Sequence, residues 1–198
     1  GVGTDFFGQI ISDIEGKYSP GDYVIGISQH AFSSIVNIPS NQAVLVPKKL
    51  EHINLSGFPL VFLSTIIPVT LYLNVLAGKS ILIHNASGGL GLTLCHYLMS
   101  NGANIYATTH GSKKQNYLRD LGISNIADSR QKHTYFSDVK LDGAFYTLNS
   151  SLLDLTLTCL KDGGTVIDYT LDAAKNLKKV IEGKRSFNYI PFNLEEYL

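Results

Sequence analysis

The chain has 198 residues, with 16 Lys and Arg against 16 Asp and Glu, 44% hydrophobic residues and two cysteines. It is long enough to bury a sizeable core, and its composition excludes a disordered or collagen-like chain. The formal net charge of zero gives no electrostatic basis for binding nucleic acid or an anionic membrane surface. Cys95 and Cys159 are too few for a disulfide scaffold or a four-cysteine zinc site, so we expect a reducing, cytoplasmic compartment.

The first fifty residues have the pattern of short strands separated by turns. Turn-forming residues stand at 19–22 (SPGD) and 39–41 (PSN). The apolar or β-branched stretches between them predict four strands, over residues 7–14, 23–27, 34–38 and 43–46. Strands this close together indicate a small, mostly antiparallel β unit.

A charge-free stretch follows, over residues 53–78, and it is long enough to span a bilayer. Pro59, Pro68 and Asn74 interrupt it, and it leads at once into a strand-like segment. We therefore expect a buried helical segment over residues 59–76, broken at Pro68, rather than a membrane helix.

From residue 80 onward, short apolar strands alternate with helical segments. Strands are predicted over residues 80–84, 104–108, 125–127, 143–146, 165–169 and 187–190, and helices over 90–100, 113–121, 152–160 and 173–181. This alternation is typical of parallel βαβ units. The predicted fold class is therefore α/β, with a Rossmann-type, doubly wound parallel sheet.

The most informative segment is a glycine-rich turn between the first of these strands and its helix. After the strand Ile81-Leu82-Ile83-His84, the chain continues Asn85-Ala86-Ser87-Gly88-Gly89-Leu90-Gly91. Glycines in such a turn let the backbone approach a pyrophosphate, and the following helix N-terminus offers free N–H groups. The spacing departs from G-x-G-x-x-G, but the strand–turn–helix setting favours a nucleotide site over a turn that binds nothing.

The end of the next strand is where a dinucleotide-binding fold selects its coenzyme. NAD sites place an acid there, about twenty residues past the glycines, to bind the ribose 2′-OH. The chain instead reads Thr108-Thr109-His110-Gly111-Ser112-Lys113-Lys114. Hydroxyl and ammonium groups suit a 2′-phosphate, which favours NADPH over NADH; the alternative is a solvated start of a helix.

Metal and hydrolase chemistry have no support in the sequence. The histidines are scattered without the spacing of metal ligands, and they stand at His30, His52, His84, His96, His110 and His133. No Gly-x-Ser-x-Gly motif is present. We therefore expect no metal-binding residues.

Several segments, in one order, are similar to known enzymes. Residues 3–8 (GTDFFG) and 20–26 (PGDYVIG) resemble barrel strands of medium-chain dehydrogenases/reductases. Residues 62–65 (FLST), 84–91 (HNASGGLG), 117–122 (YLRDLG) and 126–130 (IADSR) together resemble the enoyl reductase domain of polyketide synthases and animal-type fatty acid synthases. The resemblance covers nearly the whole chain. It implies part of a GroES-like β substrate-binding domain over residues 1–52, a Rossmann nucleotide-binding domain over 53–190, and a return to the β domain over 191–198.

The resemblance also implies a function and a set of cofactor contacts. Such domains are zinc-free, bind NADPH and reduce the α,β double bond of an enoyl thioester carried on acyl carrier protein. The implied partners are therefore that thioester, the other domains of a megasynthase and a second copy in a homodimer. The implied cofactor-binding residues are Ala86, Ser87, Gly88, Gly89 and Gly91 at the pyrophosphate, Thr109, Ser112 and Lys114 at the 2′-phosphate, and Tyr146 near the nicotinamide.

The chain departs from the family at its catalytic candidates. The family has a Tyr pair where this chain has Ile66-Ile67, and an Asn-Ser pair at Tyr146-Thr147. The candidate proton-donating Lys falls on Leu171, and a candidate acid falls on Asn193. The catalytic residues therefore stay unknown. Three interpretations stay open: an active NADPH-dependent enoyl reductase, an inactive pseudo-reductase with a structural or dimerising role, and a free zinc-independent quinone oxidoreductase-like enzyme.

Overall fold

A computed structural model describes residues 2–13, 15–131, 136, 138–147, 152–182 and 186–197. The chain forms two compact units, Gly1–Ser64 and Thr65–Leu198. Helix α1 (Phe58–Tyr72) begins in the first unit and ends in the second.

The first unit contains a three-stranded antiparallel sheet. Its strands are β1 (Asp5–Gln9), β2 (Tyr23–Ile27) and β3 (Ala43–Leu45), in the order β1-β2-β3, with two short 3-10 turns, Ser40–Gln42 and Lys48–Leu50. The first strand ends at Gln9 rather than continuing to Ile14, a residue outside the described part.

The third predicted strand of this unit, over residues 34–38, is wrong. The hydroxyl of Ser33 donates to the carbonyl of Ile35 (2.9 Å) and accepts from its N–H (3.4 Å). A Ser side chain that bonds the backbone two residues on offers that backbone an alternative to a strand ladder. The segment therefore forms bends instead of a strand.

Helix α1 runs without interruption through Pro68, where the sequence predicted a break. Its first turn is anchored by Asp5, whose Oδ1 accepts from the N–H of Leu60 at 3.0 Å. Thr65, Pro68 and Val69 are buried. This burial offsets the cost of a proline inside a helix, about 3 kcal/mol. No helix among the described residues is long and apolar enough to cross a membrane.

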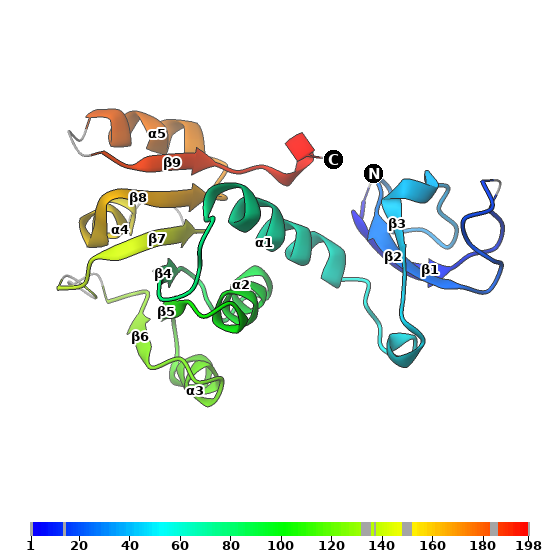
Figure 1. Cartoon of the computed structure of the whole chain (residues 1–198), viewed down its shortest axis with the longest axis horizontal. Helices are drawn as coiled ribbons and strands as arrows, with labels where there is room; N and C mark the ends of the chain where they lie inside the picture. The colour runs from blue at the N-terminus through cyan, green and yellow to red at the C-terminus, as the bar shows by residue number, and fades with distance from the viewer. Residues whose placement is uncertain are drawn as a thin grey trace. The chain divides into compact units, whose positions relative to one another are not determined.

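The second unit is a six-stranded, all-parallel sheet with helices between its strands (Figure 1). The strands are β4 (Ser80–Ile83), β5 (Asn104–Thr109), β6 (Asn125–Asp128), β7 (Leu141–Tyr146), β8 (Leu160–Asp168) and β9 (Asn188–Pro191). The helices between them are α2 (Gly89–Ser100), α3 (Ser112–Asp120), α4 (Leu153–Cys159) and α5 (Ala173–Glu182). The predicted Rossmann-type α/β fold is confirmed.

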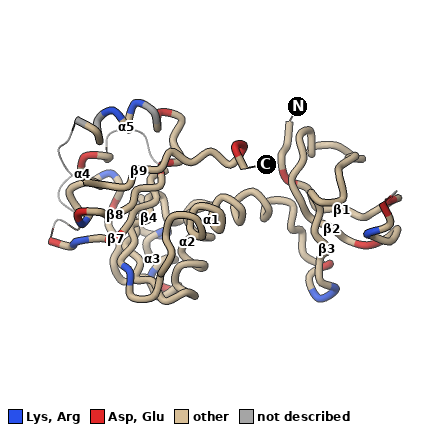
Figure 2. The backbone as a smooth tube through the Cα atoms, turned by 45° about the horizontal axis from the view of Figure 1, so that its top comes forward, with Lys and Arg blue, Asp and Glu red and all other residues tan. Residues whose placement is uncertain are grey.

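The strand order β6-β5-β4-β7-β8-β9 reverses direction between β4 and β7. Crossovers between parallel strands are right-handed, so the connections through α2 and α3 and those through α4 and α5 lie on opposite faces of the sheet. The centre of the sheet is apolar on both sides, and Ile81, Leu82 and Ile83 of β4 are fully buried. Figure 2 shows that α1 and α2 carry no Lys, Arg, Asp or Glu along their length.

A buried carboxylate fixes the turn after β8. Asp168 accepts hydrogen bonds from the N–H of Thr170 (2.7 Å), from Asn176 Nδ2 (2.9 Å) and from the hydroxyl of Tyr189. Asp168 and Asn176 are almost completely buried. Burial, reinforced by the Asp168 carboxylate, raises the pKa of Tyr189, which stays a donor. The network therefore ties β8, α5 and β9 together at one edge of the sheet.

Replacing Asp168 with Ala should lower the free energy of unfolding by about 3 kcal/mol, because Asn176 and Tyr189 each lose a buried partner. Urea unfolding followed by circular dichroism measures the change. Asp162→Ala, at an exposed position near the start of strand β8, serves as the control and should change stability by less than about 0.5 kcal/mol. Equal effects of the two substitutions would contradict a structural role for the network.

Candidate functional site

The order in which the chain adds strands to the sheet reverses between β4 and β7. The carboxyl ends of these two parallel strands lie side by side. Ligands of open α/β sheets bind in the crevice outside such a reversal point. Here β4 leads into the glycine-rich turn and α2, while β7 leads into Thr147. Residues 148–151, which follow, lie outside the described part of the chain.

The turn from β4 to α2 is tight. Asn85 adopts a left-handed conformation (φ 50°), and its carbonyl accepts from the N–H of Gly88 at 2.9 Å. Helix α2 then begins at Gly89, and Gly88 at its N-cap provides no side-chain cap. The first N–H groups of a helix have no partner within it, so they are available to an anion at the positive end of the helix dipole.

The glycines of the turn have different roles. A Cβ on Gly91 would lie 2.4 Å from the carbonyl oxygen of Asn85 and 2.7 Å from Cα of Ala86, so Gly91 lets α2 pack against the turn. Gly91 is buried, whereas Gly89 is exposed. The sequence placed both at the pyrophosphate, but Gly91 shapes the turn from behind, and Gly88 and Gly89 form the accessible part.

Hydroxyl and backbone hydrogen bonds attach the turn to the neighbouring strand β5. The N–H of Ala86 donates to the carbonyl of Thr108 at 3.0 Å, and the hydroxyls of Ser87 and Thr109 are 2.6 Å apart. Thr109 is only 2% exposed. Its side chain therefore supports Ser87 rather than facing solvent, although the sequence predicted a contact with the coenzyme.

A buried histidine lies directly beneath the turn. His84 Nε2 is 2.9 Å from the hydroxyl of Thr156, and Nδ1 is 3.0 Å from the hydroxyl of Thr108. The Thr156 hydroxyl donates to the carbonyl of Leu152 (2.7 Å), so it accepts from Nε2–H, and Nδ1 accepts from Thr108. The ring is therefore neutral, and burial lowers the pKa of His84 to about 4.

The carbonyl of His84 is also engaged, because it accepts from the hydroxyl of Thr147 at 3.1 Å. One residue thus connects the ends of β4, β5 and β7 with α4. Sequence reasoning treated His84 as one of several scattered histidines and missed this role.

An acid that sequence reasoning missed lies beside the end of β5. His110 follows the last residue of β5, and its Nδ1 is 3.0 Å from Oδ1 of Asp128, the last residue of β6. The parallel register of the two strands, which pairs Thr109 with Asp128, brings these side chains together, and no sequence motif indicates it. Ser112 and Lys114 are exposed in the first turn of α3, as a contact with a 2′-phosphate requires.

Tyr146, expected near the nicotinamide, and the residues at the family's catalytic positions do not form a catalytic set. The side chain of Tyr146 is fully buried and makes an edge contact with His84, at a ring separation of 5.4 Å. Leu171 is fully exposed in the turn after β8. Asn193 is exposed, and its Oδ1 accepts from the N–H of Glu195. Ile67 is partly buried within α1.

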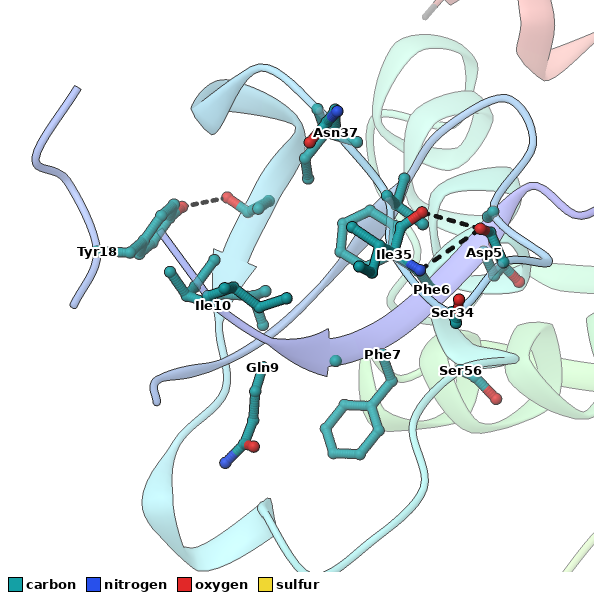
Figure 3. A pocket seen from close by; sticks show the side chains of 18 of the residues that line it. Asp5, Phe6, Phe7, Gln9, Ile10, Tyr18, Ser34, Ile35, Asn37 and Ser56 are labelled. Carbon is teal, nitrogen blue, oxygen red and sulfur yellow. Dashed lines mark hydrogen bonds between the residues drawn. The ribbon is translucent and has the colours of Figure 1, made fainter. Parts of the chain in front are cut away.

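A recess of about 1160 Å³ lies in the first unit. Figure 3 shows Phe7 and Gln9 on one side of β1, with Phe6 on the other. The charged residues around the recess are all acidic, namely Asp5, Asp13 and Glu15. This charge does not suit a nucleotide phosphate, so the glycine turn is the better site.

Metal and thiol chemistry find no support in the described part of the chain. Its residues include no group of three or more His, Cys, Asp or Glu able to hold a metal ion, and His133 lies outside it. Both cysteines are buried, and burial raises the pKa of Cys95 to about 12, which keeps that thiol protonated.

The sequence was compared with protein families and with individual known proteins. No protein-family model matches the chain. The chain is 30% identical to probable polyketide synthase 24 of Dictyostelium discoideum, across 100% of its own length, and 29% identical to probable polyketide synthase 25 across 98%. It spans 9% of each relative.

Solved structures agree with this assignment. JamJ enoyl reductase superposes with a TM-score of 0.85 at 27% identity, over 98% of this chain and 61% of that one. Escherichia coli quinone oxidoreductase complexed with NADPH shares the fold, with a TM-score of 0.82 at 19% identity over 100% and 64%. The protein therefore has the enoyl reductase fold of the medium-chain dehydrogenases/reductases. Its homologues are polyketide synthases, as the motifs predicted.

The buried neutral state of His84 predicts a pH dependence of stability. Its pKa lies below the usual 6.5, so the unfolded chain binds the proton more readily than the folded one. The free energy of unfolding should therefore fall by roughly 3 kcal/mol between about pH 6.5 and pH 4, and the loss is absent above that range.

Chemical unfolding at several pH values tests this, with His84→Gln expected to flatten the profile in that range. His96→Gln, on the exposed side of α2, is the matched control and should keep the wild-type slope. A wild-type slope that persists in His84→Gln would show that another group is responsible.

Proposed function

We propose that this chain is a NADPH-binding enoyl reductase domain of a polyketide synthase, whose chemical step is slow. The observation that carries the proposal is the turn from β4 to α2, which presents exposed glycine backbone and a helix start without a side-chain cap at the point where the sheet reverses. The implied substrate is an enoyl thioester on acyl carrier protein. The implied neighbours are other synthase domains and a second copy of the chain.

The residues at this turn fit a dinucleotide. Ala86, Ser87, Gly88 and Gly89 would hold the pyrophosphate through backbone N–H groups and the Ser87 hydroxyl. The Asn85 side chain occupies the space that a side chain at position 88 would need, since a Cβ on Gly88 would lie 2.8 Å from Asn85 Nδ2. Ser112 and Lys114 would attract the additional phosphate of NADPH. The NADPH complex of the E. coli quinone oxidoreductase, which has the same fold, supports a nicotinamide coenzyme.

When bound, NADPH supplies a hydride to the β-carbon of the enoyl thioester. The protein then has to orient the acyl group, stabilise the enolate oxygen and deliver a proton to the α-carbon. Leu171 lies where the family carries a candidate proton donor, and an exposed apolar side chain does neither of the last two tasks. We infer that proton delivery relies on solvent and that turnover is slow.

A second candidate is a pseudo-reductase kept for a structural or dimerising role. Leu171, Ile67 and Asn193 favour it, because each replaces a candidate catalytic group of the family. The turn is still formed and supported by the hydrogen bond between Ser87 and Thr109, which favours retained nucleotide binding. The quinone oxidoreductase-like alternative has the support of the shared fold only.

Replacing Gly89 with Val should abolish NADPH binding and leave the fold intact. Gly89 is exposed at the start of α2, so the side chain blocks the pyrophosphate without crowding the core. Calorimetric titration with NADPH, alongside circular dichroism, measures both effects. Gly57→Val, at an open position in the first unit, should bind like wild type. Undiminished binding by Gly89→Val would place the nucleotide elsewhere.

Leu171→Lys should raise the rate of NADPH oxidation by about a hundredfold or more, because general acid assistance is worth roughly 10² to 10⁴. The assay uses a crotonyl thioester on acyl carrier protein and the nicotinamide absorbance. Ile181→Lys, another exposed apolar position, is the control and should have no effect. Wild-type turnover of about one per second or faster, which is ordinary for enzymes, would contradict the slow chemical step.

A further inference from the structure

Strand β1 lies at one edge of the three-stranded sheet of the first unit, beside β2. Thr4 and Ile10, which flank β1, both form backbone hydrogen bonds on the β2 side. Alternate residues of an antiparallel strand direct their N–H and C=O groups to opposite sides, so Asp5, Phe7 and Gln9 direct theirs away from β2. In the described part of the chain, these outward backbone groups have no hydrogen-bond partner.

The recess of the first unit opens along this free edge. All the residues from Asp5 to Gln9 line it, although the side chains of a strand alternate between the two faces of its sheet. A hollow over one face would be lined mainly by every second side chain. Gly8 lies in open space, because a Cβ there would meet no atom within 4 Å. The edge is therefore accessible to another strand.

The other sheet edges in the described part of the chain carry features that hinder strand addition. Strand β3 has three residues, with Pro47 shortly after it, β9 ends at Pro191, and β6 ends at Asp128, which pairs with His110. Short edge strands, prolines and charges all protect an edge from pairing. Strand β1 has five residues, no Pro and one charge, at Asp5. It is the edge that is most open to pairing.

The sequence of β1 fits a second copy of itself. Antiparallel pairing about a two-fold axis at Phe7 places Phe7 opposite Phe7 of the second copy, and Asp5 opposite Gln9. These three residues have the free backbone groups, so each opposed pair can exchange two hydrogen bonds. Phe7 and Gln9 lie on the same side of β1 (Figure 3), so the pairing sets ring against ring and amide against carboxylate. Leu60 occupies only Oδ1 of Asp5, and the described residues leave Oδ2 without a partner.

We propose that two copies of this chain associate through β1, so that the three strands of each first unit join into one continuous antiparallel sheet. The contact is isologous and closes at a dimer, because each copy uses its only β1 edge. The inference assigns a surface to the second copy that the proposed function includes, and it rests on that function only for the expectation of a second copy. It does not require nucleotide at the glycine turn.

Sedimentation velocity over a range of protein concentrations, without nucleotide, measures the dimer. Gln9→Glu places a carboxylate opposite Asp5 and should weaken the dimer, whereas Gln9→Lys places an ammonium group there and should strengthen it. Two such pairs form in each dimer, so the dissociation constant should rise or fall by about threefold to tenfold. Gln42→Glu and Gln42→Lys, at an exposed residue directly before β3, are the matched controls and should associate like wild type.

A disulfide tests the register. Phe7 is the residue of β1 that lies opposite itself, with Cα atoms about 5.5 Å apart in a hydrogen-bonded pair, which is within the disulfide range of about 4.4 to 6.8 Å. Phe7→Cys should therefore form a covalent dimer on oxidation. Gln9→Cys should not, because its two copies would lie about 13 Å apart along the strands. The native Cys95 and Cys159 are buried and do not compete.

The outcomes separate this inference from nucleotide binding. A monomer at every concentration overturns the inference, whether or not NADPH binds. A dimer in which Gln9→Glu and Gln9→Lys respond alike, or in which Gln9→Cys cross-links and Phe7→Cys does not, overturns the β1 surface. If Phe7→Cys does not fold after losing its ring contact with Tyr23, the opposite responses of the two Gln9 variants decide. A β1 dimer that binds no NADPH overturns the proposed function alone.

Discussion

The attachment of the β4–α2 turn to strand β5 is the interaction on which the candidate site depends. A short turn before a helix can adopt several conformations, but here Ala86 is bonded to the backbone of Thr108 and Ser87 to the hydroxyl of Thr109. Beneath it, His84 joins Thr108 to Thr156 of α4. These bonds hold the start of α2 next to the end of β5. A dinucleotide site in this fold needs both elements at one place.

The two ends of the site differ in the functional groups that they provide. At the end of β5, Ser112 and Lys114 provide a hydroxyl donor and a positive charge suited to a phosphorylated ribose, and the Asp128 carboxylate beside them is paired with His110. At the ends of β7 and β8, the residues that stand at family catalytic positions are buried, like Tyr146, or apolar and exposed, like Leu171. The Asp168 network holds the turn that carries Leu171 firmly in place. These differences support the proposal of a domain that binds a coenzyme but provides few groups for proton transfer.

Much of this could be predicted from the sequence, because strand–helix alternation after residue 80 is a local signal and the glycine turn has a characteristic setting. The predicted strand over residues 34–38 does not form, because the Ser33 hydroxyl makes local hydrogen bonds with the backbone of Ile35. A pattern of apolar residues does not reveal such bonds. The continuity of α1 through Pro68 depends on burial. The contact between Asp128 and His110 was missed because the two residues are 18 positions apart and only the parallel register of β5 and β6 brings them together. The burial of Tyr146 and Thr109 likewise results from packing, which no sequence motif indicates.

The most direct test of the central claim is to follow backbone amide signals by nuclear magnetic resonance while NADPH is added. Binding at the glycine turn predicts that the amides of Ser87, Gly88 and Gly89 and those at the end of β5 shift together and saturate, while amides around the recess of the first unit, such as Phe7 and Ile35, do not follow the same titration. Shifts confined to the first unit, or no shift at the turn at saturating NADPH, would contradict the account.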